Sequence, residues 1–210
     1  MSRKALIVYG GMAGHCPKEC AELFGPWLES QGFEVETSDT LDVYGDAEKL
    51  KAQSLIVPMW TCGDLTKEQA TALTAAVNKG AGLAGFHAGL GDAFRKVTKF
   101  QFMVGGQFVG HLGGKIPSYE VNIVDHKHEI TLGLDDFSLT NTEQYYMQVD
   151  VSNHVLATTK CENGVTLPAV WTRPYGQGRV FYASYGHTHK DFDVPEAREI
   201  VQRGMLWASR

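Results

Sequence analysis

The chain has 210 residues, of which 43% are hydrophobic and 20% are charged, and its formal net charge at pH 7 is -5. This composition is typical of a globular domain, and the 19 Lys and Arg residues form no cluster that would attract nucleic acid or anionic lipid. No apolar run reaches the ~20 residues of a membrane helix, and the start of the chain has no signal-peptide pattern, so we expect one cytoplasmic domain over residues 1–210 with a neutral small-molecule substrate.

Strands and helices alternate through the first half of the sequence. Short apolar or alternating runs predict four strands, in residues 4–10, 31–38, 54–60 and 82–87. A helical pattern follows the first strand, and another begins at the N-cap Thr66 and ends at Gly80. A further helix is expected in AGLGDAFRKV, residues 88–97. Such alternation predicts an α/β fold with a mainly parallel sheet and helices on both faces.

The pattern changes in the second half of the chain. Strand-like segments follow one another with turns and little helical periodicity between them, in residues 119–125, 143–151, 155–159, 168–173 and 179–186. We expect these segments to extend or cover the sheet as antiparallel strands. A final helix is predicted from Pro195 to Ala208, because Pro195 and Glu196 are residue types favoured in a first helical turn.

Three histidines lie where predicted strands end. His15 follows the first strand, His87 ends the fourth, and His187 follows the last, whereas His111 lies in the glycine-rich segment VGGQFVGHLGG. Ligands of open α/β sheets bind beyond the carboxyl ends of the strands, so these imidazoles are candidates for one shared site. The alternative is that each is an isolated surface or core histidine.

His87 also occupies the centre of the pattern Gly85-Phe86-His87-Ala88-Gly89. In many hydrolases, small residues flank a strained strand-to-helix turn of this kind, and the central side chain is raised above the sheet. An imidazole in that position can bind a metal ion, transfer a proton or donate a hydrogen bond to a substrate oxygen. A stable acyl intermediate is not expected.

Other motifs give weaker signals. The glycine-rich segments match neither a phosphate-binding loop nor the dinucleotide fingerprint, and HEITL lacks the second histidine of a zinc-protease helix. His126 and His128 are two residues apart, and we favour a solvated or turn-capping role for them over a metal site. The four cysteines form no disulfide framework, and we interpret Cys16 and Cys20 as free thiols rather than ligands.

Several spaced motifs, in one order from about Lys4 to Trp207, resemble the ThuA family, which is named for trehalose utilisation. These motifs are YGGMAGH, LTKEQATAL, GLAGFHAGLGDAFR, VGGQFVGH, HEITLGLDDF, TEQYYM and PAVWTRPYGQGRVFYASYGH. The resemblance implies a flavodoxin-like fold related to the class I glutamine amidotransferases, whose Cys-His-Glu triad has its cysteine at the elbow. On that comparison His87 stands in place of the cysteine and His187 resembles the triad histidine. His189 stands where the triad pattern has a carboxylate, and Cys16 and Cys62 lie outside the elbow, so glutaminase activity is not expected.

An amidotransferase-like crevice lined with imidazoles predicts metal binding or acid–base catalysis. Neutral imidazoles suit zinc or a similar divalent ion, and three protein ligands plus water are frequent in catalytic zinc sites. We nominate His15, His111 and His187 as metal ligands. His87 is then either a fourth ligand or a catalytic group.

The resemblance also places further residues near the site. Glu143, which we expect to begin a strand, is a candidate general base, because burial against Tyr145 and Tyr146 would raise its pKa whereas a metal ion would lower it. The alternative is a surface ion pair of Glu143 with Arg95 or Arg179. From its position after the elbow, Asp92 is expected to contact substrate or to cap a helix, and Tyr145 is also expected to contact substrate.

Two residues after the third strand complete the predicted site. Trp60 and Thr61 are expected to form an apolar and a polar wall of the pocket, although Trp60 is equally suited to the hydrophobic core.

The family resemblance implies a carbohydrate-metabolism enzyme. We expect it to act on a disaccharide or on a 3-keto-sugar supplied by an NAD-dependent sugar dehydrogenase. A keto group acidifies the neighbouring C–H bond, so isomerisation, elimination or hydration would share proton removal by Glu143 or His87 as a first step. The alternative from another class is a non-catalytic sugar-binding or regulatory protein. Aromatic residues in the second half of the chain suggest a homodimer.

Overall fold

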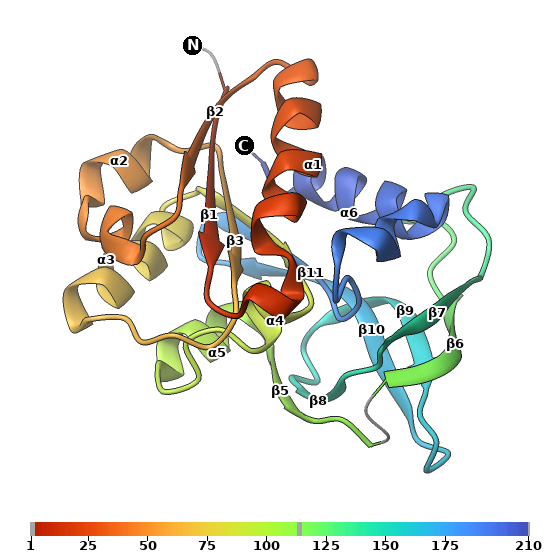
Figure 1. The fold of residues 1–210 in the computed structure, drawn as a ribbon. Coiled ribbons are helices and arrows are strands. Elements are labelled where there is room, and N and C mark those ends of the chain that lie inside the picture. Colours follow the sequence, from red (N-terminus) through yellow and green to blue (C-terminus); the bar gives the residue numbers. More distant parts are fainter. Residues whose placement is uncertain (1–2, 113–114, 210) are drawn as a thin grey trace.

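The central feature of the computed structural model is a large sheet, and residues 3–112 and 115–209 are described (Figure 1). Within these residues nine strands are hydrogen-bonded in the order β2-β1-β3-β4-β11-β10-β9-β6-β7. The parallel strands are β1 (Arg3–Gly10), β2 (Phe33–Ser38), β3 (Leu55–Trp60), β4 (Gly82–Phe86) and β11 (Gly178–Ala183). Their order, with β1 between β2 and β3, is the flavodoxin-like arrangement that was predicted.

The remaining strands are antiparallel to their neighbours. They are β10 (Thr166–Tyr175), β9 (His154–Lys160), β6 (Lys115–Ile123) and β7 (Phe137–Glu143). A separate ribbon is formed by β5 (Gly106–Gly110) and β8 (Tyr146–Val149). The predicted fold class, with a parallel half and added antiparallel strands, is therefore confirmed.

Helices cover both faces of the parallel strands. One face carries α1 (Pro17–Ser30) and α6 (Pro195–Ala208), and the other carries α2 (Ala47–Ala52), α3 (Lys67–Asn78) and α5 (Thr98–Val104). Three short 3-10 segments, η1 (Ala13–His15), η2 (Leu41–Gly45) and η3 (His189–Asp193), lie in the connections. Among the described residues, the structure contains no helix with the length and apolar character that crossing a bilayer requires.

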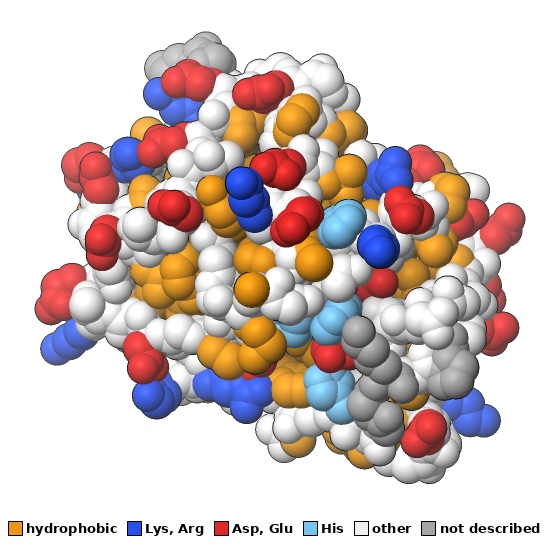
Figure 2. Space-filling view, in the orientation of Figure 1, with side chains coloured by type: hydrophobic (Ala, Val, Ile, Leu, Met, Phe, Trp, Pro, Cys, Tyr) orange, Lys and Arg blue, Asp and Glu red, His pale blue; other side chains and the backbone are white. Residues whose placement is uncertain are grey.

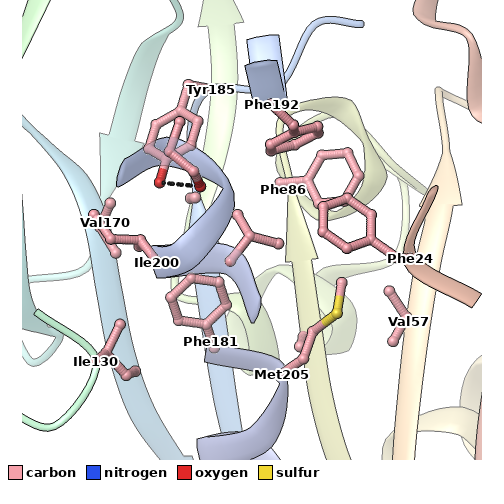
Figure 3. Close-up of a cluster of buried hydrophobic side chains, with 14 of the residues drawn as sticks. Phe24, Val57, Phe86, Ile130, Val170, Phe181, Tyr185, Phe192, Ile200 and Met205 are labelled. Atoms are coloured by element: carbon pink, nitrogen blue, oxygen red, sulfur yellow. Dashed lines mark hydrogen bonds between the residues drawn. The ribbon is translucent and has the colours of Figure 1, made fainter. Parts of the chain in front are cut away.

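The two faces divide the hydrophobic residues between two cores, because successive side chains of a strand point to opposite faces. In β1, Ala5 and Ile7 join the core beneath α1 and α6, whereas Leu6 and Val8 join the core beneath α3 and α5. Figure 3 shows the first core, in which the ring of Phe192 in η3 packs edge to face against Phe24 of α1 and Phe86 of β4. These cores fix the strand ends from which the site residues extend.

The structure departs from the predicted elements in the segment after β4. Instead of a helix over residues 88–97, only α4 (Ala88–Gly91) is helical. The chain then pairs with the residues after β3, because the N–H of Cys62 donates to the carbonyl of Asp92 and the N–H of Phe94 donates to the carbonyl of Cys62. This pairing leaves Asp92 at the end of the helical turn rather than within a helix.

Other departures concern strands. β5 and β7 were not predicted, since the sequence of β7, FSLTNTE, is rich in residues that favour turns. Glu143 ends β7 rather than beginning a strand, and β8 starts later, at Tyr146. The last strand, β11, pairs antiparallel with β10 but parallel with β4, so it completes the parallel half of the sheet.

Candidate metal centre

Five side chains from five separate segments converge beyond the carboxyl ends of the parallel strands. His15 ends η1 after β1, His87 follows β4, and His187 follows β11. His111 follows β5 and Glu143 ends β7, so the antiparallel half contributes the other two. We refer to these five residues as the histidine–glutamate cluster. Figure 2 shows histidine side chains gathered around an acidic one on this face.

The carboxylate of Glu143 lies at the centre of the cluster. Its Oε2 atom is 2.8 Å from His187 Nδ1, 3.3 Å from His87 Nε2, 3.4 Å from His111 Nε2 and 3.9 Å from His15 Nε2. The candidate ligand atoms of His15, His87, His187 and Glu143 all lie within 4.8 Å of one another. His111 approaches Glu143 from the more exposed side, with 28% of its side chain accessible against 1% for His87.

The donor atoms of the cluster fit a metal ion. His87 Nε2, His187 Nδ1 and Glu143 Oε2 are buried, yet none has a hydrogen bond of normal geometry within the described part of the chain. Buried polar atoms without partners are costly, so such atoms facing one another are expected where an ion or water is bound. Ligands ~2.1 Å from one tetrahedral zinc ion are ~3.4 Å apart, which lies within the range of the four distances to Glu143.

Neighbouring groups orient the imidazoles. The Nδ1–H of His87 donates to the carbonyl of Ser184 at 3.3 Å, and that of His111 donates to the carbonyl of Gln144 at 3.4 Å. A carbonyl can only accept, so both rings present an unprotonated Nε2 towards Glu143 when neutral. His15 Nδ1 lies 2.6 Å from Thr61 Oγ1. Partners of this kind typically fix the tautomer and orientation of metal-binding histidines.

The backbone at His87 is strained in the way that the elbow pattern predicts. Its dihedral angles, φ 46° and ψ −126°, lie outside the regions that non-glycine residues normally adopt. The hydroxyl of Tyr182 donates to the carbonyl of His87 at 2.9 Å, and the N–H of His87 donates to the carbonyl of Ala183 at 2.7 Å. The ring of Tyr145 stacks on the imidazole with centroids 3.8 Å apart. These contacts hold His87 facing the cluster.

Asp191 is a buried residue of the site that was not predicted. Its Oδ2 atom accepts hydrogen bonds from Thr142 Oγ1 at 2.7 Å and from the backbone N–H of His187 at 2.8 Å. Burial raises its pKa, and these hydrogen bonds oppose that rise. Asp191 thus ties the segment carrying His187 to the strand that ends at Glu143. Its position four residues after His187 is the only signal in the sequence, and it is a weak one.

Burial and charge set the protonation states in the cluster. Burial lowers the pKa of His87 from 6.5 to about 4, and it also lowers the pKa of His15, with the neighbouring His187 adding to that effect. Burial alone would raise the pKa of Glu143, but the proximity of the His187 and His87 imidazoles to its carboxylate brings that pKa well below its ordinary value. At neutral pH, Glu143 is therefore a carboxylate and His87 a neutral imidazole, the forms that bind metal ions.

We expect the metal-free protein to lose stability as the pH falls from 6.5 towards 4. Because the pKa of His87 is lowered from 6.5 to about 4, the unfolded chain binds a proton in this range that the folded protein does not. The stabilisation is fully present above the pKa of His87 in the unfolded chain. It is lost as the pH falls to the pKa of His87 in the folded protein, and the loss amounts to roughly 3 kcal/mol at most. Denaturant titrations in chelator at several pH values measure it. His87→Asn should flatten the pH dependence, whereas exposed His126→Ala should not; an unchanged slope in His87→Asn would contradict the assignment.

The four predicted substrate-contacting residues lie around the cluster in different ways. Thr61 contacts His15 and Tyr145 stacks on His87, so both are buried supports of the imidazoles. Trp60 is partly buried against the core beneath α3. Asp92 is buried and forms an ion pair with Arg95.

The two arginines considered as surface partners of Glu143 are engaged elsewhere. Arg95 pairs with Asp92, and Arg179 donates to the carbonyl of Ser209 at 2.6 Å while its guanidinium lies over Trp207. Neither arginine is therefore available to hold Glu143 at the surface. Instead of pairing with an arginine at the surface, Glu143 lies close to four imidazoles.

The remaining candidates lie outside the cluster. His128 Nδ1 accepts a hydrogen bond from the N–H of Ile130 at 3.2 Å, and Asp125 accepts from two backbone N–H groups of the same turn. His126 is exposed. Cys16 and Cys20 are free thiols, and Cys20 lines a cavity of about 20 Å³ behind His15 and His87.

Comparisons with known proteins agree with this architecture. The family model described as ThuA, trehalose utilisation, matches residues 4–208. A solved structure described as a ThuA-like protein from Bacteroides uniformis has a TM-score of 0.83 and 21% identity, covering 98% of this chain and 91% of that chain. Its counterpart from Parabacteroides merdae has a TM-score of 0.80 and 18% identity, with 99% and 90% covered.

A more distant solved structure has the same overall fold. It is described as a proposed GMP synthase component from Thermoplasma acidophilum, and it has a TM-score of 0.56 and 12% identity, covering 99% of this chain and 96% of that chain. At such low identity the likeness shows the fold alone. No curated protein sequence matches the chain.

Proposed function

Because the chain belongs to the ThuA family of trehalose utilisation, we propose that it is a carbohydrate-metabolism enzyme using metal-assisted acid–base chemistry on a sugar. The observation that carries this proposal is the convergence of four imidazoles on one carboxylate, with three buried donor atoms lacking hydrogen-bond partners. Such a set combines the ligands of a borderline divalent ion with a carboxylate able to move a proton.

The metal ligands that the geometry favours are His15, His87 and His187. They differ from the set nominated from the sequence in one member, since His87 replaces His111. His87 is only 1% exposed and lies beneath Tyr145, so it has no direct access to a substrate. A divalent ion held there would act as a Lewis acid that stabilises negative charge developing on a substrate oxygen.

Glu143 is the proposed general base. Its lowered pKa keeps it ionised at neutral pH, and 17% of its side chain remains accessible. In a keto-sugar, the carboxylate would accept the proton of the carbon next to the carbonyl group. An isomerisation would be completed when the former carbonyl carbon receives a proton and the proton of the neighbouring hydroxyl group passes to the former carbonyl oxygen. His111, whose Nε2 is 3.4 Å from Glu143 Oε2 on the exposed side, is placed to pass that proton to and from solvent.

Exchange with solvent deuterium tests the proposal directly. In D2O, the protein is expected to incorporate deuterium next to the carbonyl group of at least one member of a panel of 3-keto-glycosides, as followed by NMR or mass spectrometry. His87→Ala should abolish the incorporation, and His126→Ala, which removes a histidine outside the cluster, should leave it unchanged. Absence of both exchange and turnover across the panel would refute this function and favour a non-catalytic sugar-binding role.

One partner follows from the same proposal. A keto-sugar is formed by oxidation of a sugar hydroxyl, so an NAD-dependent sugar dehydrogenase is the activity that would supply the substrate. We also propose a homodimer as the assembly, because the described surface of the second half of the chain includes exposed apolar side chains such as Val124 and Val151.

A further inference from the structure

A groove of about 360 Å³ lies between α5 and the β5–β8 ribbon. Pockets of roughly 300–1,000 Å³ are the size that binds small molecules. Two apolar side chains, Phe102 and Val149, line the groove together with several polar ones, which include Arg95, Thr98, Gln107, Gln148 and Asp150. None of these residues belongs to the histidine–glutamate cluster.

Arg95 and Phe108 connect the groove to the cluster. The guanidinium of Arg95, which lines the groove, lies 5.1 Å from the ring centroid of Phe108. The ring of Phe108 lies 4.9 Å from that of His111 and 4.1 Å from that of Tyr145. Basic, hydrophobic and histidine side chains accordingly follow one another along the lower part of the face in Figure 2. Arg95 and Phe108 thus lie between the groove and His111.

We propose that this groove is a second sugar subsite, so that the protein takes a disaccharide with one ring at the cluster and the other in the groove. The inference rests on the proposed function. Phe102, which is 63% exposed, offers an apolar platform for the C–H face of a pyranose ring. Gln107 and Gln148 lie opposite each other in the ribbon and supply both donors and acceptors for hydroxyl groups.

The charges at the groove favour a neutral ligand. Arg95 is paired with Asp92, and Asp150 accepts from Ser152 while lying 3.4 Å from the guanidinium of Arg173. Both charged groups of the lining are therefore compensated within the chain, and neither requires a charged partner. A ligand with one apolar face and a rim of hydroxyl groups matches this combination better than an anion or a hydrophobic peptide.

Binding measurements with unoxidised sugars test the subsite separately from the chemistry. Calorimetric titrations would compare trehalose, which has two rings, with methyl α-D-glucoside, which has one. We expect trehalose to bind more tightly, and Phe102→Ala and Gln148→Ala each to weaken trehalose relative to methyl glucoside by about fivefold. Leu132→Ala, which truncates an exposed apolar side chain elsewhere, is the matched control.

Three results would overturn the subsite. The first is equal affinity for the two sugars in the parent protein, and the second is a change below twofold in the relative affinity for trehalose in both groove variants. The third is a dimer that Phe102→Ala dissociates, which would make the groove a contact between copies. Failure of the proposed function would differ, because deuterium exchange into keto-glycosides would then be absent although trehalose still bound in the groove.

Discussion

Protein purified without chelators is expected to contain close to one divalent ion per chain, and His187→Ala is expected to lose almost all of it. His187 Nδ1 lies closest to the central carboxylate oxygen, at 2.8 Å, and its ring is 4.9 Å from that of His15. Removing a ligand should reduce affinity by more than the ~10–100-fold that loss of a supporting hydrogen bond typically costs. Elemental analysis of the parent and variant proteins, before and after zinc addition, measures the effect.

Two further variants make this result specific. Thr61→Val removes the hydroxyl 2.6 Å from His15 Nδ1 and leaves every nominated ligand in place, so it should weaken binding by about 10–100-fold rather than abolish it. His126→Ala should bind metal as the parent does, because its side chain is exposed outside the cluster. A parent protein that holds no metal even after zinc addition would contradict the metal centre and leave unassisted acid–base chemistry as the role of the cluster.

The part of the site that belongs to the parallel half of the sheet was predictable from the sequence. His15, His87 and His187 each follow a short apolar run bounded by glycine, and parallel strands end at one edge. The elbow pattern around His87 also predicted its unusual backbone, which has φ 46°. These predictions succeeded because local signals and topology agreed.

No comparable rule predicts which side chains of the antiparallel half reach the cluster. Glu143 and His111 reach the cluster only because β7 and the β5–β8 ribbon fold back towards the parallel strands, and neither β5 nor β7 has a strong strand pattern. Glu143 was therefore nominated through a family-like motif, with the wrong end of a strand assigned to it. Asp191 was missed entirely, because its partners, Thr142 and the N–H of His187, are set by tertiary structure.

Glu143→Gln is expected to slow solvent-deuterium exchange into a keto-sugar by about 10²–10⁴-fold, the usual contribution of a positioned general base. The amide has nearly the same shape as the carboxylate but does not accept a proton at neutral pH. Because His15, His87 and His187 remain, the variant should still bind metal, with weaker affinity after loss of the negative charge. Exchange rates measured at saturating zinc separate the catalytic loss from any loss of metal.

The neighbouring histidine supplies the comparison for this prediction. His111→Asn removes the group proposed to exchange protons with solvent but keeps Glu143, so its rate should fall less than that of Glu143→Gln. If Glu143→Gln exchanged within tenfold of the parent, the base would lie elsewhere in the cluster. If Glu143→Gln instead lost its metal as completely as His187→Ala, Glu143 would be a ligand, and the exposed His111, with Nε2 3.4 Å from Glu143 Oε2, would become the group that moves the proton.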